Sequence, residues 1–283
     1  MTTHTVACID GSALSNTVAD YAAWSAARMG TELVLLNVLN DNRSNDSTDF
    51  SGNIGVDERL RLLNEITELE EKRAKLARQQ GHLFLEDAKH HVAAVHAQPL
   101  LRQRHGDLVD TLVDIENEIR LLVIGRQGKR GNGVGQRIGH QVERVIRALH
   151  KPVWVVHGEF KAPESILIAF DNSTTAKKAV EMVAGSPLFR GIPVHVVMVG
   201  ADTEEHREQL EWAEQKLTDQ AFVVQTAVVN GAVEEALNDY VVAQGIGALV
   251  MGAYGHSRIR EFFVGSHTNA LITSSKVPLL LLR

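Results

Sequence analysis

Cysteine is nearly missing from this chain of 283 residues, because Cys8 is its one example and lies within an apolar run. A single cysteine cannot form an internal disulfide, which excludes a disulfide-stapled extracellular fold and favours a reducing compartment. Long apolar runs are also missing, and stretches such as 278–282 are far too short to cross a bilayer. The first residues lack the basic and apolar regions of a signal peptide. We therefore expect a cytoplasmic protein that does not enter a membrane, with Cys8 packed in its core.

Basic residues are in the minority, since 29 lysines and arginines face 35 aspartates and glutamates and the formal net charge is −6. This balance argues against a surface that binds nucleic acid. The three tryptophans are too widely spaced for a base-stacking platform, and Trp154, within a predicted strand, is expected in the core or at an interface. With 44% hydrophobic residues, the chain can bury one large core or two of about 140 residues each.

Recognisable catalytic and metal-binding patterns are absent from the sequence as well. Histidines cluster at His90, His91 and His96, but their spacing matches no zinc motif and no cysteine pair accompanies them. A solvated helix surface explains this cluster better. No Ser-His-Asp arrangement or acid pair indicates a hydrolase. We predict no catalytic residues and no protein-bound metal.

What the chain does contain is an internal repeat. The segment TVACIDGSALSNTVADYAAWSA at the N-terminus matches SILIAFDNSTTAKKAVEMVAG near the middle, and their apolar runs end in Asp10 and Asp171. Three further segment pairs follow in the same order, and the last pair places Pro152 and Pro278 before a final apolar strand. Each copy is therefore predicted to contain five strands alternating with helices. Ser and Thr after each aspartate suit a helix N-cap.

Apolar strands that alternate with helices predict an α/β fold, in which an open five-stranded parallel sheet carries helices on both faces. We place the two domains at residues 1–157 and 164–283, separated by a short polar stretch with glycine and proline. The two final strands, VWVVH and PLLLL, are apolar edges that need a partner. We predict that they meet around a pseudo-twofold axis, so that the domains form an intramolecular pseudo-dimer. A homodimer of two chains is a further alternative.

The first copy carries an insertion at about residues 40–98. It begins with a polar segment typical of a mobile loop and continues into a charged helical pattern with apolar residues at helical spacing: Leu60, Leu63, Ile66 and Leu69. This helix is either a partner-binding element or lid, or a solvated crossover helix that packs one stripe on the sheet. The second interpretation is favoured.

The strongest motif lies in the second copy, where Gly252 and Gly255 are followed after nine residues by Gly265 and Ser266. It stands between an apolar strand and a helical pattern. A glycine-rich turn there lets backbone N–H groups approach an anion, and the helix N-terminus adds partial positive charge. Because ligands of open α/β sheets sit at the carboxyl ends of the strands, this position predicts a phosphate site.

With this motif the chain resembles the ATP-binding kind of universal stress protein, whose signature is Gly-x2-Gly-x9-Gly-Ser/Thr. The resemblance covers the chain as a tandem pair, apart from the insertion, and implies an adenine nucleotide alpha hydrolase-like fold. It implies ATP, with Mg, as the ligand and weak hydrolysis at most. The nucleotide-binding residues that it implies are Asp171 near the nucleotide, Val199 with its backbone at the adenine, and the phosphate loop of Gly252, Gly255, Gly265, Ser266 and His267.

The first copy departs from the signature. Its loop has Gly125 and Gly128, then ten residues, then Gly139 and His140 in place of the hydroxyl residue. The loop is rich in glycine, which raises the entropy cost of ordering it, although its basic residues could pair with phosphate. Asp10 and Val38 remain in place. We predict the weaker nucleotide site here, formed by Asp10, Val38, Gly125, Gly128 and Gly139.

Three functions are compatible with these features. The first is a stress-response regulatory protein that binds ATP in its C-terminal domain. The second is a slow ATPase or phosphotransferase, for which the second loop offers only Glu261 as a carboxylate. The third is a nucleotide-independent scaffold that recruits a partner through the charged helix of the insertion.

Overall fold

The computed structural model describes residues 3–39, 56–95, 98–128, 140–252 and 266–283, and for residues 56–59, 140 and 266–269 the backbone alone. The first repeat runs through β1 (His4–Cys8), α1 (Ser15–Met29), β2 (Leu33–Leu39), α2 (Val56–Val92), β3 (Leu100–His105), α3 (Leu108–Asp114), η1 (Glu116–Glu118), β4 (Ile119–Gly125), α4 (His140–Ala148) and β5 (Val153–Val156). The second repeat runs through β6 (Ile166–Ala169), α5 (Thr174–Gly185), η2 (Pro187–Phe189), β7 (Val194–Val199), α6 (Glu204–Thr218), β8 (Val224–Val229), α7 (Val233–Gln244), β9 (Ala248–Gly252), α8 (Ser266–Ser274) and β10 (Leu279–Leu282).

The strands form one sheet in the order β3-β2-β1-β4-β5-β10-β9-β6-β7-β8. Within each repeat the strand pairs are parallel, and the two repeats share the same internal order. The predicted α/β class is confirmed. The prediction of two five-stranded sheets needs one refinement, because the two halves join into a single ten-stranded sheet.

The joint between the repeats is the pairing of their last strands. β5 and β10 pair antiparallel, with Leu280 opposite Trp154 and flanking pairs on both sides. Each strand thereby covers the other's apolar edge, as predicted, and the four residues of each are buried. The pseudo-dimer is therefore part of the sheet itself rather than a loose contact between two domains.

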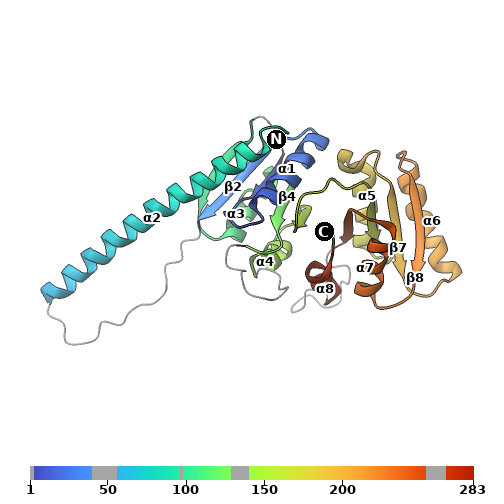
Figure 1. Ribbon diagram of the computed structural model, residues 1–283. Coiled ribbons are helices and arrows are strands. Elements are labelled where there is room, and N and C mark those ends of the chain that lie inside the picture. The colour runs from blue at the N-terminus through green and yellow to red at the C-terminus, as the bar shows by residue number, and fades with distance from the viewer. Residues whose placement is uncertain (1–2, 40–55, 96–97, 129–139, 253–265) are drawn as a thin grey trace.

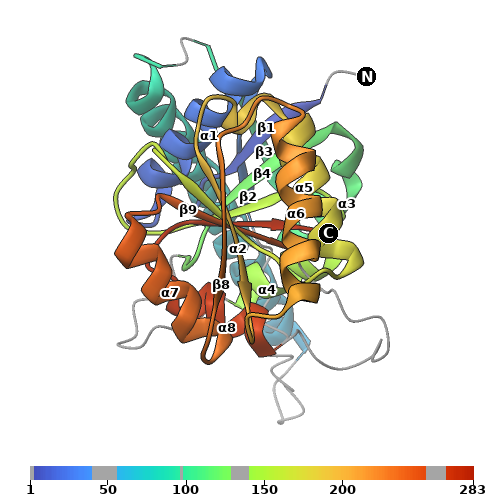
Figure 2. The same cartoon turned by 90° about the vertical axis from the view of Figure 1, so that its right-hand side faces the viewer.

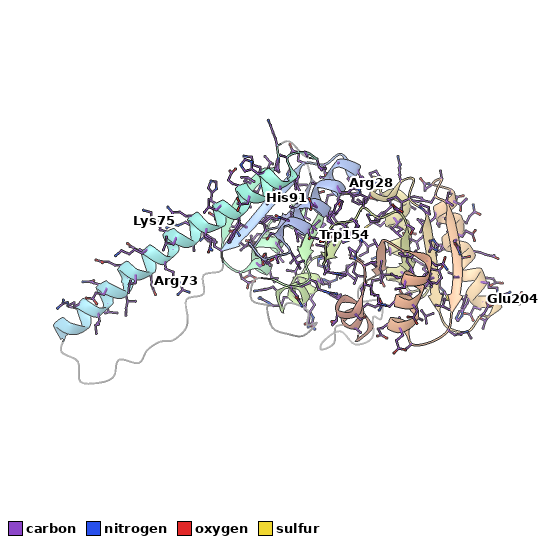
Figure 3. The ribbon with its side chains drawn as sticks, in the orientation of Figure 1. Arg28, Arg73, Lys75, His91, Trp154 and Glu204 are labelled. Atoms are coloured by element: carbon purple, nitrogen blue, oxygen red, sulfur yellow. The ribbon has the colours of Figure 1, made fainter. Side chains whose placement is uncertain are left out.

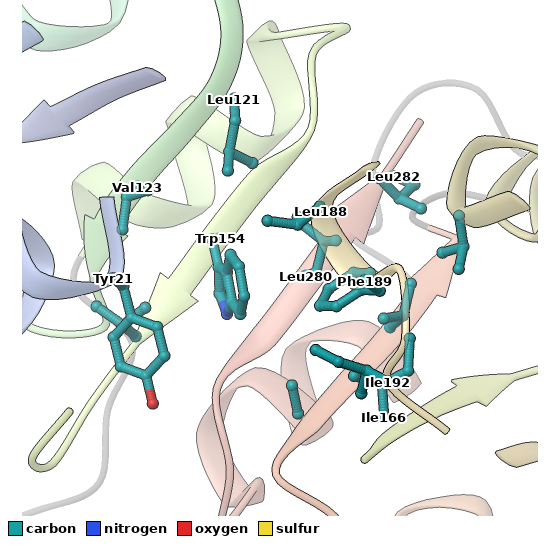
Figure 4. Close-up of a cluster of buried hydrophobic side chains, with 14 of the residues drawn as sticks. Tyr21, Leu121, Val123, Trp154, Ile166, Leu188, Phe189, Ile192, Leu280 and Leu282 are labelled. Carbon is teal, nitrogen blue, oxygen red and sulfur yellow. The ribbon is translucent and has the colours of Figure 1, made fainter. Parts of the chain in front are cut away.

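Helices cover both faces of the sheet, as Figures 1 and 2 show. One hydrophobic core contains buried residues of α1, α2, α5 and α6, and the other contains those of α3, α4, α7 and α8. The first core passes without interruption from one repeat to the other. Its centre is Trp154, whose ring lies 5.4 Å from Tyr21 and 5.8 Å from Phe189 between centroids (Figure 4). Trp154 thus lies in the core and at the interface between the repeats.

The segment between the repeats is held against α1. The Thr17 hydroxyl donates to the Gly158 carbonyl at 2.7 Å, and the Tyr21 hydroxyl donates to the Lys161 carbonyl at 3.1 Å. Arg28, at the other end of α1, donates to the carbonyls of Leu188 and Arg190 in the second repeat. These bonds fix the linker and add polar contacts to the shared core.

The helix of the insertion, α2, does not pack as the sequence predicted. We expected α2 to pack its apolar stripe on the sheet, but the four residues of that stripe are exposed: Leu60 55%, Leu63 46%, Ile66 38% and Leu69 64%. Among the described side chains of α2, those buried in the core belong to its C-terminal part: Leu85, Ala88 and Val92. The rest projects away from the body (Figures 1 and 3). The predicted mobile loop before the helix lies outside the described residues.

Candidate functional site

The strand order of each repeat reverses at one point. In the second repeat, β6 lies between β7 and β9, so the chain leaves β6 toward one side and returns to β9 on the other. α5 follows β6 on one face, whereas α8 follows β9 on the opposite face. Ligands of open α/β sheets bind where the strand order reverses in this way. The corresponding place in the first repeat is the carboxyl end of β1 and β4.

Both aspartates stand at this place and form the same turn. The Asp171 carboxylate Oδ1 accepts a hydrogen bond from the Ser173 amide at 3.0 Å, and Asp10 Oδ1 accepts from the Ser12 amide at 2.9 Å. The next residue has a positive φ in each copy, +59° at Asn172 and +72° at Gly11. Asparagine and glycine are the residues that tolerate this backbone conformation. The turn holds each carboxylate beside the start of the following helix.

The helix starts differ between the copies. In α5 the Ser173 hydroxyl accepts from the Ala176 amide at 3.2 Å, as an N-cap should. In α1 the cap position is Leu14, which has no capping side chain, so the expected cap is wrong for the first repeat. There the Ser15 hydroxyl accepts from the Gly11 amide at 3.0 Å instead. The polar residues after Asp10 therefore form hydrogen bonds within the turn and do not cap the helix.

Gly252 packs where a larger residue has no room. A Cβ at Gly252 would lie 2.8 Å from the Thr175 carbonyl carbon and 3.0 Å from the Ala176 nitrogen. The matching residue in the first repeat is Gly125, whose Cβ would lie 3.2 Å from the Leu14 Cβ. In both copies the first glycine of the motif thus lets the end of one strand touch the first turn of the opposite helix.

The other predicted residue of a strand end is also in place. Val199 ends β7 and is half-buried, and Val38, also half-buried, lies one residue before the end of β2. These strands neighbour β6 and β1 in the sheet. Val199 and Val38 therefore lie at the same edge as Asp171 and Asp10, one strand further out.

The first repeat carries an obstruction that the sequence did not reveal. The ring of Phe84, from α2, stands so close to Gly11 that a Cβ there would lie 2.3 Å from its Cζ. A Cβ at Gly128 would lie 3.0 Å from Asp10 Oδ2, so this glycine turn closes onto the carboxylate. Buried residues at the same spacing, 85, 88 and 92 in α2 and 210, 213 and 217 in α6, align Phe84 with Gln209. Gln209 bonds along its own helix to Glu205. Among the described residues, Phe84 and Gly128 thus crowd the space beside Asp10.

The two loops are described only at their ends. The backbone of Ser266 and His267 forms the first turn of α8, and His140 begins α4. α8 therefore starts at the residue where the motif predicted a helix N-terminus. Other predicted loop residues lie outside the described part of the chain: Gly139, Gly255, Gly265, Glu261 and the loop arginines and lysines.

Two half-buried basic residues connect the first repeat to the end of α8. Arg126, directly after Gly125, donates to the carbonyls of Thr273 at 3.1 Å and Ser275 at 3.2 Å. Burial lowers the pKa of Arg126 below its usual value. Burial and the nearby charge of Arg126 also lower the pKa of His157. The start of the first loop is thus anchored to the helix that begins at the second loop.

The described residues offer little for thiol or metal chemistry at these edges. Burial, followed by the negative charge of Asp10, raises the pKa of the Cys8 thiol to about 12, so this thiol is a poor nucleophile. Among the residues with described positions, no group of three or more His, Cys, Asp or Glu side chains could hold a metal ion. No helix in the described ranges is long and apolar enough to cross a membrane.

The chain is similar to known proteins along nearly its whole length. The sequence model of the universal stress protein family matches residues 1–157 and 163–283. A curated universal stress protein from Synechocystis is 31% identical over 281 residues, covering 98% of each chain. Another, from Mycobacterium bovis, is 23% identical over 203 residues, covering 63% of each chain. A crystal structure of a universal stress protein from Archaeoglobus fulgidus covers 98% of this chain and 97% of its own, with a TM-score of 0.69 and 18% identity. At that identity the structural likeness shows the fold alone.

Proposed function

The chain belongs to the universal stress protein family, and from this premise we propose that it binds ATP in its second repeat and acts as a regulatory binding protein. The observation that carries the proposal is the arrangement of residues at the carboxyl ends of β6 and β9. Asp171 is held there by an Asx-type turn, Gly252 packs on the first turn of α5, and α8 begins on the other side.

The phosphates would lie at the N-terminus of α8. Its first amides have no partner within the helix and carry the positive end of the helix dipole. The residues proposed to hold phosphate are Gly252, Gly255, Gly265, Ser266 and His267. The adenine would meet the backbone of Val199 at the end of β7, with Asp171 between base and phosphates. Mg would accompany ATP through its phosphate oxygens, which need no dedicated metal cage in the protein.

The second repeat is favoured over the first because of Phe84. A nucleotide beside Asp10 would have to displace this ring, which stands against Gly11. It would also have to separate Gly128 from the Asp10 carboxylate. Neither obstruction has a described counterpart beside Asp171. We propose one nucleotide per chain, held by the domain of residues 164–283 rather than by the domain of residues 1–157.

Binding rather than catalysis is the proposed activity. Phosphoryl transfer needs a positioned base or water-orienting group and a carboxylate that holds the metal. Asp171 Oδ1 is already engaged by the Ser173 amide, which leaves the side chain suited to recognition. The proposed output is a change in partner affinity with occupancy of the site.

The test is isothermal titration of the full chain with Mg-ATP. Gly265→Val should abolish binding, because a branched side chain would fill the phosphate position. The matched control is Gly139→Val, which makes the same change in the first repeat and should leave the affinity unchanged. Absence of binding by the unaltered chain at millimolar ATP would refute the proposal. Loss of binding in Gly139→Val but not in Gly265→Val would place the site in the first repeat instead.

A nucleotide-independent scaffold is the second candidate, and the exposed leucines of α2 favour it. The two candidates separate cleanly in one experiment. Deletion of residues 41–78 removes the projecting part of the helix and keeps Leu85, Ala88 and Val92 on the sheet. If the scaffold interpretation holds, this deletion abolishes partner binding and ATP has no effect on it.

A further inference from the structure

α2 consists of two parts with different surroundings. Its buried residues Leu85, Ala88 and Val92 have the same spacing as Leu210, Ala213 and Leu217 of α6. This correspondence aligns the start of α6, at Glu204, with Gln79. Residues 56–78 of α2 therefore have no counterpart in the second repeat. They project away from the body (Figures 1 and 3). At 1.5 Å per residue their length is about 35 Å.

Leucine recurs at every seventh position along α2. Leu62, Leu69 and Leu76 of the projecting part are 37%, 64% and 65% exposed, and Ile66, 38% exposed, lies between the first two. Leu83, 60% exposed, continues the series just beyond the projecting part. Leucine at this period marks the d positions of a coiled coil, and Ile66 then occupies an a position. The residues that pack on the sheet lie on the opposite side of the helix, so this stripe faces away from the body.

Helices in proteins gain most of their stability from packing of an apolar face. The leucines of this stripe are exposed and so lack that packing within the described chain. The stripe can also pair with the same stripe of a second copy, because both carry apolar residues at the same seven-residue spacing. We propose that two copies of this chain dimerise through residues 60–78 of α2 as an antiparallel coiled coil.

The charges beside the stripe select the antiparallel orientation. A parallel pair would place Arg73 opposite Arg73 of the second copy and Glu65 next to its Glu70, and both contacts repel. An antiparallel pair with Ile66 opposite Leu69 of the second copy places Glu65 beside its Lys72. By twofold symmetry this attraction occurs twice.

The antiparallel register also fits the remaining residues. Arg73 lies opposite Leu62 of the second copy, where its aliphatic stem can cover the leucine while the guanidinium stays in water. The centre of the pairing falls between residues 66 and 69, close to the middle of the projecting segment 56–78. The projecting segments therefore overlap along nearly their whole length. The two folded bodies then stand at opposite ends of the coil and do not contact each other.

The test measures the mass of the full chain in solution by sedimentation velocity. The unaltered chain should sediment as a dimer and Leu69→Glu as a monomer. Leu60→Glu makes the same change on the opposite side of the helix and should stay dimeric. Leu83→Glu should also stay dimeric, because Leu83 lies beyond the antiparallel overlap but would face its own copy in a parallel coil. A monomeric unaltered chain or a dimeric Leu69→Glu overturns the proposal, and a monomeric Leu83→Glu overturns the orientation.

Charge reversal tests the orientation without removing an apolar residue. Glu65→Lys should weaken the dimer roughly tenfold, since each of two attractions with Lys72 becomes a repulsion. The double variant Glu65→Lys with Lys72→Glu should restore the original affinity. In a parallel coil Glu65→Lys would instead strengthen the dimer, because the new lysine would meet Glu70. Circular dichroism of each variant confirms that the body remains folded.

Discussion

Replacing Gly252 with alanine should destabilise the protein, and the same change at Gly125 should not. At Gly252 the new Cβ would lie 2.8 Å from the Thr175 carbonyl carbon and 2.9 Å from the Thr175 Cβ, so the first turn of α5 must shift. At Gly125 the nearest atoms are Leu14 Cβ and Cδ1, at 3.2 and 3.3 Å, so a shift of a few tenths of an ångström relieves the contact. Neither glycine has a positive φ, so backbone strain plays no part in the difference.

The magnitude follows from two opposing effects. Gly→Ala at a compatible backbone position stabilises by about 0.4–1 kcal/mol, because the unfolded chain loses freedom. Overpacking of a rigid contact costs about 1–3 kcal/mol. The entropy gain is common to both variants, so the difference between them isolates the steric cost, about 1–3 kcal/mol. Gly125→Ala should therefore be close to neutral.

Urea denaturation of both variants measures this difference, with circular dichroism as the signal. For a chain of this size each kcal/mol also corresponds to about 2–4 °C in Tm. Gly252→Ala should in addition weaken ATP binding, because α5 begins beside Asp171. The reasoning is refuted if Gly125→Ala costs as much as Gly252→Ala, since the two contacts would then be equally rigid.

Three further predictions concern the interface between the repeats. His157 has a folded pKa below its ordinary value of 6.5, so the folded state binds fewer protons than the unfolded state. The free energy of unfolding should therefore fall as the pH drops below about 6.5. In His157→Gln the urea midpoint should depend less on pH between about pH 7.5 and 5.5. Trp154→Ala should lower the free energy of unfolding by about 3–5 kcal/mol, measured by heat or urea, because the ring is fully buried. Trp154→Phe should cost far less, because the buried indole N–H has no hydrogen-bond partner among the described atoms. Arg126→Ala should cost about 1–2 kcal/mol by losing its bonds to Thr273 and Ser275, and an unchanged urea midpoint would show that those bonds contribute nothing.

The sequence predicted the fold well because the relevant signals are local and occur twice. Asp10 and Asp171 end matching strands, and Pro152 and Pro278 precede matching strands, so the duplication is visible in the amino-acid sequence alone. The pairing of β5 with β10 followed from a simple requirement, that two apolar edges need a cover. The first glycine of each motif also lies where its strand-to-helix position indicated.

The rest depended on contacts between distant segments. Phe84 comes from the insertion, and no periodicity or motif indicates that its ring stands against Gly11. The bonds of Arg126 to the end of α8 join residues that are 147 and 149 positions apart. The spacing of Leu60, Leu63, Ile66 and Leu69 predicted a helix correctly. The spacing alone does not say whether these residues face a sheet, solvent or a second chain. The matching spacing of buried residues in α2 and α6 settles which part of the helix packs on the sheet.

We propose that one repeat binds ATP and the other does not. Native mass spectrometry of the full chain in the presence of Mg-ATP counts the nucleotides on each chain directly. We predict one ATP per chain, and none on Gly265→Val. Two ATP per chain would contradict the difference between the repeats, and no ATP at millimolar concentration would contradict the proposed function.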